Sequence, residues 1–518
     1  MIRSLTASEE DVSCVADLLI IGAGIAGLLV ATRAAERGLR VVVMESGSER
    51  QLADTHPLNE VVHLRSVYEG AAAGRFRCLG GTSTRWGGAM IPFLKADLHE
   101  GGADAWPLRH SDLFAYIEEV EALFGLPGGS YEAPEVARSI DDRVTSYIPR
   151  LAKWPAFAHR NVAALLNDRI RSQAGPEIWL EATATAFTLS SDGRLDKVTA
   201  KAPNGRRLSV RARETVIAAG AIESTRLLLL ADRQHGNRMF APDDVLGRYF
   251  HDHLSSVVAV IDPSDRRALN RVAGFRFEGA GMRNLRFEPS ESPEVRARVP
   301  AGFAHLGFAD SAGGGFDALR AVYRRVQQRR LPSLAMLFPL LKAAPWLSRA
   351  LWWRFIEHRL LYPASAPIEL HMVIEQEPRA DNRIFLSSDH FDAYGQPLAV
   401  IDWEVTSEDQ DRLTRSTDLF LEFWSHSTLS QLGVVRRRAS GEAESDLVRG
   451  GGIYHPGGST RMGRSSGDSV LDSDLRTFRV PNISVVATSA FPTAGGANPT
   501  MMLMMAALRL ADRLISAN

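Results

Sequence analysis

The sequence contains only two cysteines, Cys14 and Cys78, among 518 residues. Neither belongs to a Cys-x-x-Cys pair, which argues against a dithiol redox centre and against a zinc site. We therefore predict no metal ligands. Two cysteines also provide no disulfide framework, which favours a reducing compartment, so we expect a cytoplasmic location.

Long apolar segments and an excess of one charge are also missing. Since no run of about 18 apolar residues is present, the sequence predicts no membrane-spanning helix. The first residues, MIRSLTASEEDVS, lack the apolar stretch typical of a secretory signal. The formal net charge is -1, with 60 basic and 61 acidic residues, and this gives no global electrostatic reason to bind nucleic acid.

Near its start the sequence contains a strand–helix–strand pattern. The apolar run Leu18–Ile21 is typical of a buried parallel strand, and Arg40–Met44 predicts a second one. Between them, Ile25–Arg37 has helical composition, and Gly38 follows as a helix stop. The pattern predicts one βαβ unit.

The turn between the first strand and the helix reads Gly22-Ala23-Gly24-Ile25-Ala26-Gly27 and matches G-x-G-x-x-G. The first glycine permits a tight turn, the second lets a pyrophosphate approach the backbone, and the third lets the helix pack on the strand. The pyrophosphate would lie at the helix N-terminus, where free N–H groups favour an anion. Glu45 ends the next strand, where a carboxylate accepts hydrogen bonds from ribose hydroxyls. The pattern predicts a dinucleotide site without separating NAD from FAD.

The remaining periodicities predict an α/β chain, α+β overall, in which a Rossmann-type nucleotide domain is interleaved with a substrate domain on an antiparallel sheet. The nucleotide domain is predicted to comprise 1–130, 180–255 and 450–518, and the substrate domain 131–179 and 256–449. Strands are predicted within Glu181–Val216, Glu214–Ala219 and Ile368–Trp403, and helices at Trp106–Gly125, Ile222–Ala231, Thr406–Ser425 and Met501–Ile515. The methionines of the last helix are expected to pack in the core rather than to bind metal.

Several motifs resemble those of the glucose–methanol–choline (GMC) oxidoreductases. Cys78–Gly88, CLGGTSTRWGG, is similar to the family segment G-G-x-S-x-x-W-x-G along the flavin edge. Tyr454–Gly463, YHPGGSTRMG, and Val485–Met502, VVATSAFPTAGGANPTMM, resemble the two C-terminal signatures. Shorter matches occur at Trp106–Leu108, Ala218–Ser224, Val245–Leu254 and Glu375–Pro378.

The resemblance implies an FAD-binding domain and an enzyme that takes a hydride from the CH–OH group of an alcohol to give an aldehyde or ketone. In some members a histidine just before the Trp bonds to the flavin. Arg85 occupies that position here, so FAD is expected to be non-covalent. Ala487 stands where many members carry an Asp, and the resemblance here is closer to the sugar-oxidising branch, in which this position is small. The glycine pattern and the resemblance together imply cofactor contacts from Gly22, Gly24, Ile25, Ala26, Gly27, Glu45, Gly80, Gly81, Thr82, Ser83, Ala184, Ala219, Gly220, Ala487, Asn498, Pro499 and Thr500.

Two residues of the C-terminal motifs are candidates for catalysis. Alcohol oxidation needs a base for the hydroxyl proton, and a histidine has a suitable pKa. His455 occupies the family position of this base, and Asn498 occupies a second position that is His or Asn in the family. An amide there can donate to the developing oxyanion. We interpret His251 and His253 as structural.

The sequence leaves the chemistry of the substrate and of reoxidation open. A sugar or glycoside is the first expectation, and a hydrophobic or lipid-linked alcohol the second. Oxygen, a quinone or another carrier can accept the electrons. A non-redox lyase on the same scaffold and a membrane- or partner-binding protein with a vestigial fold are the competing functions. The oligomeric state is not predicted.

A basic, tryptophan-bearing insert near 316–362 has no counterpart in these motifs. No acidic residue lies between Asp317 and Glu357, whereas eight basic residues and Trp346, Trp352 and Trp353 do. Such composition is typical of an interfacial membrane segment. It also suits a lid, a subunit interface, or a helical cover with a solvated basic face, so a peripheral membrane contact is one of several hypotheses.

Overall fold

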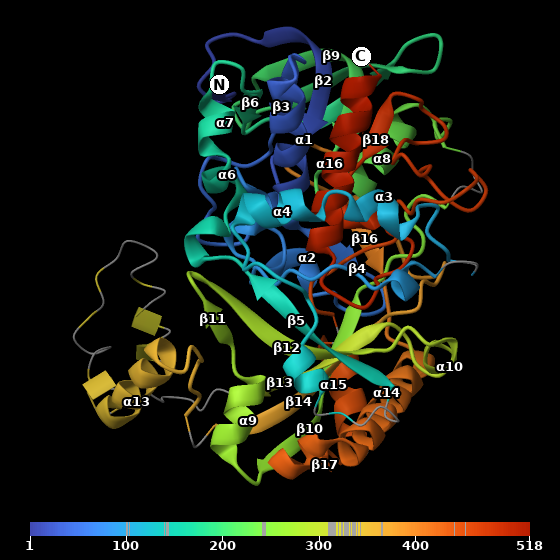
Figure 1. Ribbon diagram of the computed structural model, residues 1–518. Coiled ribbons are helices and arrows are strands. Elements are labelled where there is room, and N and C mark those ends of the chain that lie inside the picture. The colour runs from blue at the N-terminus through green and yellow to red at the C-terminus, as the bar shows by residue number, and fades with distance from the viewer. Residues whose placement is uncertain are drawn as a thin grey trace.

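The structure, a computed structural model, describes residues 1–99, 102, 104–138, 140, 145–240, 245–308, 318–319, 321–322, 325, 331, 333, 338, 340–341, 343–363, 366–439, 441–450 and 452–517. Figure 1 shows two sheet regions, one above the other, with both termini at the end occupied by the first sheet. A separate helix, α13, projects from the side of the second region.

The first sheet has eight strands in the order β1-β6-β3-β2-β9-β8-β7, with β18 beside β9. The strands from β1 to β9 in this order are parallel neighbours, β18 is also parallel to β9, and β7 and β8 extend the sheet as an antiparallel pair. The bounds are β1 (Ile2–Ser4), β2 (Val12–Ile21), β3 (Val41–Met44), β6 (Glu177–Leu180), β7 (Thr183–Leu189), β8 (Leu195–Lys201), β9 (Arg207–Ile217) and β18 (Ile483–Val485).

Helices α1 (Ile25–Glu36) and α16 (Thr500–Ser516) pack against each other on this sheet. The predicted βαβ unit is confirmed, since β2 and β3 are parallel neighbours joined through α1. Along β2, the last residues are buried, as expected for a central strand covered on both faces. Core packing of the methionine-rich helix is also confirmed, because Met501, Met502, Met504 and Met505 are fully buried.

The second sheet has seven strands in the order β11-β12-β13-β14-β10-β17, with β5 beside β12, and its ladders are antiparallel. The bounds are β5 (Tyr147–Trp154), β10 (His253–Pro263), β11 (Arg276–Glu278), β12 (Gly281–Pro289), β13 (Gly302–Phe308), β14 (Ile368–Glu375) and β17 (Gly433–Arg437). Aromatic side chains of α14 (Ser407–His426), including Phe420 and Phe423, pack against Phe287 of β12 and form the core of this layer.

A small sheet of β4 (Val61–His63), β15 (Arg383–Phe391) and β16 (Pro397–Asp402) joins chain segments from both regions. The other helices are α2 (Gly70–Ala73), α3 (His110–Phe114), α4 (Ile117–Phe124), α5 (Pro134–Ala137), α6 (Val162–Leu165), α7 (Asn167–Arg171), α8 (Ala221–Gln234), α9 (Arg266–Ala273), α10 (Pro293–Arg296), α13 (Ala344–Phe355) and α15 (Glu442–Gly450), with short 3-10 turns at Pro57–Asn59, Gly81–Thr84, Lys95–Leu98, Phe157–His159, Thr428–Leu432 and Thr488–Ala490.

Two predicted elements differ from the structure. The helix predicted over Trp106–Gly125 is divided into α3 and α4, and its first residues are not helical. The Trp106 side chain instead donates to Thr493, and the Asp112 carboxylate accepts the N–H of Arg109 at the actual helix start. The strand predicted at Glu214–Ala219 is not separate, because β9 runs continuously to Ile217.

Candidate functional site

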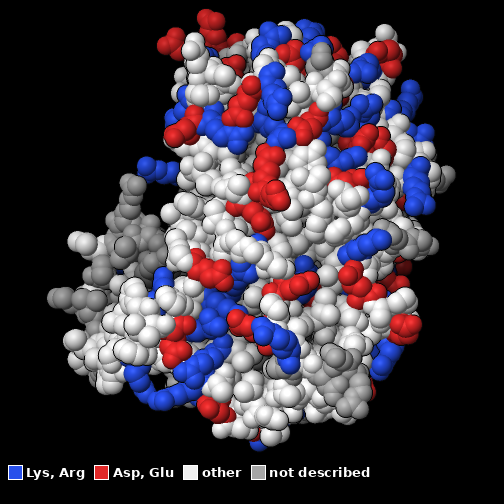
Figure 2. Space-filling view, viewed as in Figure 1, with Lys and Arg blue, Asp and Glu red and all other residues white. Residues whose placement is uncertain are grey.

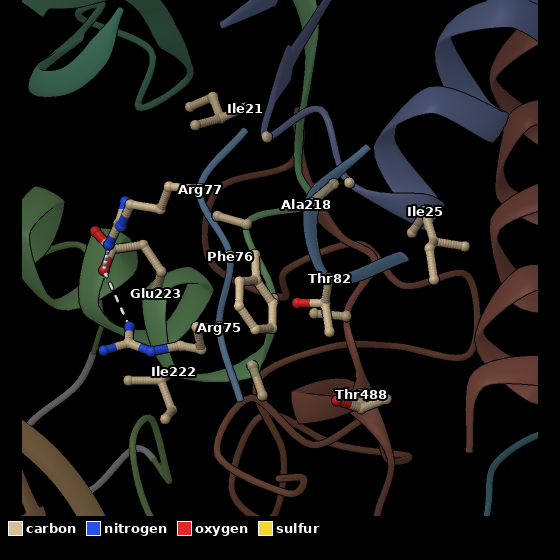
Figure 3. A pocket seen from close by; sticks show the side chains of 18 of the residues that line it. Ile21, Ile25, Arg75, Phe76, Arg77, Thr82, Ala218, Ile222, Glu223 and Thr488 are labelled. Carbon is tan, nitrogen blue, oxygen red and sulfur yellow. Dashed lines mark hydrogen bonds and ion pairs between the residues drawn. The ribbon is translucent and has the colours of Figure 1, made fainter. Parts of the chain in front are cut away.

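The main pocket lies at the carboxyl end of the parallel strands, where β2, β3 and β9 pass into their following loops. It holds about 1370 Å³ of empty space, including the part that opens to solvent. Figure 3 shows Ile25 and Thr82 on one side, Phe76 in the middle, and Arg75 and Arg77 directed toward Glu223 of α8 on the other. The carboxyl edge of such a sheet is the usual position of a bound nucleotide.

The glycines of the first turn have distinct roles. Gly22 has φ +109°, and a Cβ there would lie 2.5 Å from the backbone oxygen of Ala218. A Cβ at Gly27 would lie 2.0 Å from the backbone oxygen of Gly22, so α1 requires glycine there to pack on its strand. A Cβ at Gly24 would instead enter open space at the helix N-terminus. The turn therefore leaves room for a pyrophosphate, and the residues present fit a dinucleotide cofactor.

Glu45 lies in the pocket wall at the end of β3. Its two carboxylate oxygens accept the N–H groups of Ala23 and Gly47 at 2.9 and 2.8 Å. Burial raises the pKa of this carboxyl, while the two N–H donors oppose the shift. The backbone bonds fix the carboxylate in the position where the sequence predicts a ribose contact, and Glu45 lines the pocket.

The segment predicted to follow the flavin edge is only partly on the pocket surface. Gly81 and Thr82 line it. Gly80 faces away, since a Cβ there would lie 2.6 Å from Asn161 Oδ1. Ser83 is buried and donates to the Gly80 carbonyl at 2.6 Å while it accepts the N–H of Val162. In this structure Gly80 and Ser83 therefore shape the loop from behind the pocket. The other predicted contacts that line the pocket are Gly22, Gly24, Ile25, Ala26, Ala184, Ala219, Gly220, Ala487, Pro499 and Thr500.

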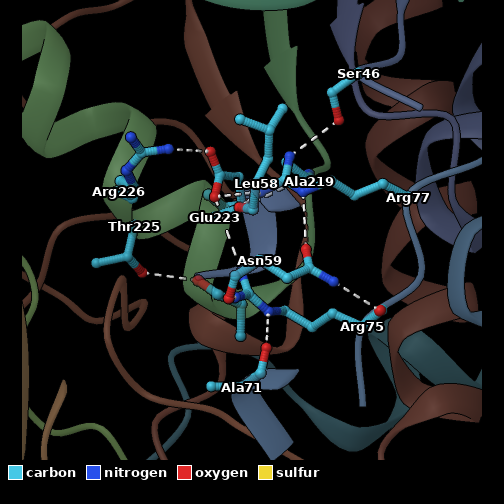
Figure 4. Close-up of polar contacts among 12 residues, drawn as sticks. Ser46, Leu58, Asn59, Ala71, Arg75, Arg77, Ala219, Glu223, Thr225 and Arg226 are labelled. Atoms are coloured by element: carbon cyan, nitrogen blue, oxygen red, sulfur yellow. Dashed lines mark hydrogen bonds and ion pairs between the residues drawn. The ribbon is translucent and has the colours of Figure 1, made fainter. Parts of the chain in front are cut away.

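The pocket wall contains a buried polar network that the sequence did not predict (Figure 4). Glu223 accepts hydrogen bonds from Arg77 at 2.7 Å and Arg226 at 3.1 Å, and Arg75 lies 3.9 Å from the same carboxylate. Asn59 accepts from Arg77 and donates to the Arg75 carbonyl, both at 2.8 Å. Burial alone would raise the pKa of Glu223, but the three guanidinium groups together lower it to about 2. Glu223 lies within the family match Ala218–Ser224, but no motif marks its partners, because they come from distant segments.

His455 and Asn498 meet at the edge of this pocket. Asn498 Nδ2 lies 3.2 Å from His455 Nε2, and Asn498 Oδ1 accepts from Arg286 at 3.1 Å. His455 lines the pocket, whereas Asn498 lies beside it. Desolvation of the ring, with further contributions from His253 and Arg286, holds the pKa of His455 well below its usual value. The imidazole is therefore neutral at pH 7 and able to accept a proton.

Asp252 holds the backbone beneath this pair. Its carboxylate accepts the N–H groups of His253, Tyr454 and His455 and the hydroxyl of Tyr68. Asp252, His253 and His455 also offer potential ligand atoms within 4.8 Å of one another. Each of the three already has hydrogen-bond partners in the protein, and together they form a hydrogen-bond network.

Comparisons with known proteins show which families and sequences this chain resembles. A family profile described as "GMC oxidoreductase" matches residues 378–507, and one described as "FAD binding domain" matches residues 17–56. The chain is 25% identical to 6'''-hydroxyparomomycin C oxidase of Streptomyces lividus, over 96% of this chain and 91% of the relative. It is 22% identical to the fructose dehydrogenase large subunit of Gluconobacter japonicus, over 98% and 99% of the two chains.

A solved structure has the same fold. The crystal structure of pyridoxine 4-oxidase from Mesorbium loti superposes with a TM-score of 0.57 and 17% sequence identity, covering 96% of this chain and 98% of the other. This likeness establishes the Rossmann-type α/β architecture predicted from the sequence, and at this identity it concerns the fold alone.

Proposed function

This chain belongs to the GMC oxidoreductases and is an FAD-dependent enzyme that oxidises an alcohol CH–OH group, and we propose that His455 and Asn498 perform the proton chemistry of this reaction. The observation that carries the proposal is the 3.2 Å contact between His455 Nε2 and the Asn498 amide at the pocket edge. A neutral imidazole and an amide donor side by side are the two groups that a reacting alcohol oxygen needs.

His455 Nε2 removes the hydroxyl proton as the general base. Asn498 Nδ2 donates to the substrate oxygen, which is left with a growing negative charge, and so orients the carbon-bound hydrogen. Arg286 holds the Asn498 oxygen, so the amide keeps its donor directed to the site. FAD, when bound, supplies the hydride acceptor. It would be held by Gly22, Gly24, Ile25, Ala26 and Glu45 together with the other pocket residues, without a covalent bond.

The proposed substrate is a sugar or glycoside hydroxyl. One relative is named a fructose dehydrogenase, and its similarity extends over nearly the whole of both chains. The small Ala487 at the pocket is consistent with the same branch. A hydrophobic alcohol is the second candidate, and exposed apolar side chains of α13 favour it.

An anaerobic flavin-bleaching screen tests the substrate proposal. The FAD-loaded protein is mixed with sugars, glycosides and long-chain alcohols, and oxygen is then admitted. We expect bleaching by a sugar or glycoside. Bleaching by long-chain alcohols alone contradicts that proposal, and conversion of a compound without bleaching would favour a lyase. Recovery of the yellow colour in oxygen identifies an oxidase, whereas its absence points to a quinone or another carrier.

Substitution of His455 tests the base. His455→Ala should give a folded protein with FAD bound that is reduced by the substrate about 100-fold to 10,000-fold more slowly. His159→Ala is the control, because His159 lies on a separate 3-10 turn outside the pocket. Flavin reduction at the normal rate in His455→Ala would refute the assignment.

We further propose that 1–130, 180–255 and 450–518 together bind FAD and that 131–179 and 256–449 bind the substrate. In support, nearly all residues of the eight-stranded sheet come from the first set, and all strands of the seven-stranded sheet come from the second, apart from His253–Ser255 at the start of β10. The three-stranded sheet joins both sets through β4 and β16.

The insert near 316–362 is proposed to contact an anionic membrane surface. Among the described residues, no helix has the length and apolar character needed to cross a bilayer. On α13 and the residue after it, Leu351, Trp352, Phe355 and Ile356 are 58 to 64% exposed, and helical spacing places them on one face. Trp353 is buried, with Arg271 over its ring at 5.4 Å, so the helix is anchored by the opposite face.

The basic composition of the insert supports an anionic partner, since no acidic residue lies between Asp317 and Glu357. In Figure 2 the described part of this projecting lobe is mostly uncharged, whereas acidic and basic side chains alternate over the body. Several basic residues of the insert, including Arg320, Arg324, Arg329, Arg330 and Lys342, lie outside the described residues.

Sedimentation with vesicles of anionic or neutral lipid tests this contact. We expect binding to anionic vesicles at low salt, and loss of binding in a Trp352→Ser, Phe355→Ser double variant. Val15→Ser is the control, because Val15 is similarly exposed at 57% but lies on β2. If the wild type does not bind at low salt, the membrane proposal is wrong.

A further inference from the structure

A chain of hydrogen-bonding groups runs from the backbone through both histidines to the pocket. His253 Nε2 lies 2.8 Å from the carbonyl oxygen of Gly495, and His253 Nδ1 lies 3.3 Å from His455 Nδ1. On the far side, His455 Nε2 meets Asn498 Nδ2, and Asn498 Oδ1 meets Arg286. Every contact in this series of hydrogen bonds joins one donor to one acceptor. The position of one proton therefore determines the positions of the others.

The backbone end of the chain determines the protons first. A carbonyl only accepts, so His253 Nε2 must carry a hydrogen. Burial lowers the pKa of His253 to about 4, so its ring is neutral and Nδ1 is an acceptor. His455 must then donate from Nδ1. Since its ring is also neutral, His455 Nε2 carries no proton.

The Arg286 end of the series independently indicates that His455 Nε2 carries no proton. Arg286 can only donate, and although burial lowers its pKa to about 10, it remains charged at neutral pH. The Asn498 oxygen therefore accepts, and the Asn498 nitrogen donates to His455. His455 Nε2, which contacts this nitrogen, must therefore be an unprotonated acceptor.

The surroundings hold this arrangement in place. Gly495 has φ +71°, and a Cβ there would lie 2.3 Å from the Phe93 ring, so its carbonyl has a fixed direction. The Gly495 N–H donates to Glu375 at 3.0 Å. Asp252 Oδ1 accepts the backbone N–H groups of both His253 and His455, at 2.6 and 2.8 Å, so one carboxylate oxygen anchors the backbones of the two residues.

We propose that His253 is a positioning residue that accepts the Nδ1 proton of His455 and thereby keeps His455 Nε2 unprotonated toward the substrate. This inference rests on the proposed role of His455 as the base. A histidine that merely filled space would not select a tautomer. The wrong tautomer would direct an N–H at the alcohol, where a base is needed, as in serine hydrolases whose histidine is misprotonated.

The tautomer can be measured directly on the FAD-loaded protein with isotope-labelled histidine and two-bond hydrogen–nitrogen correlation spectra. The signals of His455 are identified by their loss in His455→Ala. We expect a hydrogen on Nδ1 and none on Nε2 in the wild type. A hydrogen on Nε2 in the wild type would overturn the proposal without any variant.

Two substitutions at His253 separate positioning from packing. His253→Phe keeps a ring of similar shape without an acceptor, and His253→Gln keeps both an acceptor oxygen and a donor nitrogen. In His253→Phe the Nδ1–H of His455 loses its acceptor, and only the Asn498 contact still opposes the Nε2–H tautomer. We therefore expect that tautomer to appear and flavin reduction to slow about 10-fold to 100-fold, with FAD content and KM little changed. His253→Gln should recover most of both properties.

Other results would contradict the positioning role. Equal slowing in both variants, with the wild-type tautomer retained, would assign His253 to packing. If His253→Phe does not fold, the wild-type and His253→Gln spectra still decide the tautomer. Failure of the base assignment is distinguishable, because His455→Ala would then reduce flavin at the normal rate whatever the tautomer spectra report.

Discussion

Glu223 is expected to stabilise this protein through its charge, and Glu223→Gln removes that charge with little change of shape. The side chain is 8% exposed and lies against Arg77, Arg226 and Arg75 (Figure 4). Arg226 has a second carboxylate partner, Asp392, at 2.6 Å. Among the described residues, Arg75 and Arg77 would be left with neutral oxygen partners only.

The size of the effect follows from the pKa. Glu223 has a pKa of about 2 in the folded protein, against 4.5 as the reference value. At about 1.4 kcal/mol per pKa unit, its ionisation contributes about 3 kcal/mol to the free energy of unfolding at pH 7. Because the folded pKa is lowered, this contribution is present above pH 4.5 and is lost as pH falls toward 2. It should decrease to about 1.5 kcal/mol at pH 3.

Urea unfolding measures this contribution. Wild type and Glu223→Gln are compared at pH 7 and pH 3 by tryptophan fluorescence, with the same excess of FAD, because bound cofactor itself stabilises the folded state. Glu9→Gln on the exposed N-terminal segment is the control. We expect a deficit of about 3 kcal/mol at pH 7 that narrows at pH 3. Equal stability at pH 7, or an unchanged deficit at pH 3, would refute the reasoning.

Three further predictions concern the pocket. Gly27→Ala should destabilise the protein by about 1 to 3 kcal/mol, because the added Cβ would lie 2.0 Å from the backbone oxygen of Gly22. Gly24→Ala adds a Cβ in open space, so the melting temperature of the FAD-free protein should stay unchanged, while a titration should show weaker FAD binding. The opposite order of effects would contradict the assigned roles. The pKa of His455 is lowered, so the acidic limb of kcat/KM should fall below pH 6.5, and a limb above that value would exclude His455 as its source. Arg286→Met should slow flavin reduction about 10-fold to 100-fold with FAD content unchanged, since Asn498 loses a charge-assisted hydrogen bond, and normal reduction would show that the amide needs no support.

Local sequence determined the nucleotide half of the fold. A tight turn, a helix start and a buried strand each depend on residues within one short segment. The run Leu18–Ile21 and the glycine pattern at Gly22–Gly27 therefore predicted the end of β2 and the start of α1 to within a few residues. The family motifs similarly led to FAD and to alcohol oxidation. The helix predicted from Trp106 begins only at His110, because Trp106 is held by Thr493 from the far end of the chain.

The tertiary structure alone decided which polar groups meet. Arg77 and Glu223 are 146 positions apart, and His253 and His455 are 202 positions apart, yet both pairs are in contact. Such contacts depend on how β10, α8 and the C-terminal loops pack, and no periodicity or spacing encodes them. Burial and neighbouring charges then set the pKa of each group, because desolvation lowers the pKa of His455, whereas three guanidinium groups lower that of Glu223 despite its burial. The sequence thus predicted a dinucleotide turn and a candidate base, and the fold decided which polar groups surround them.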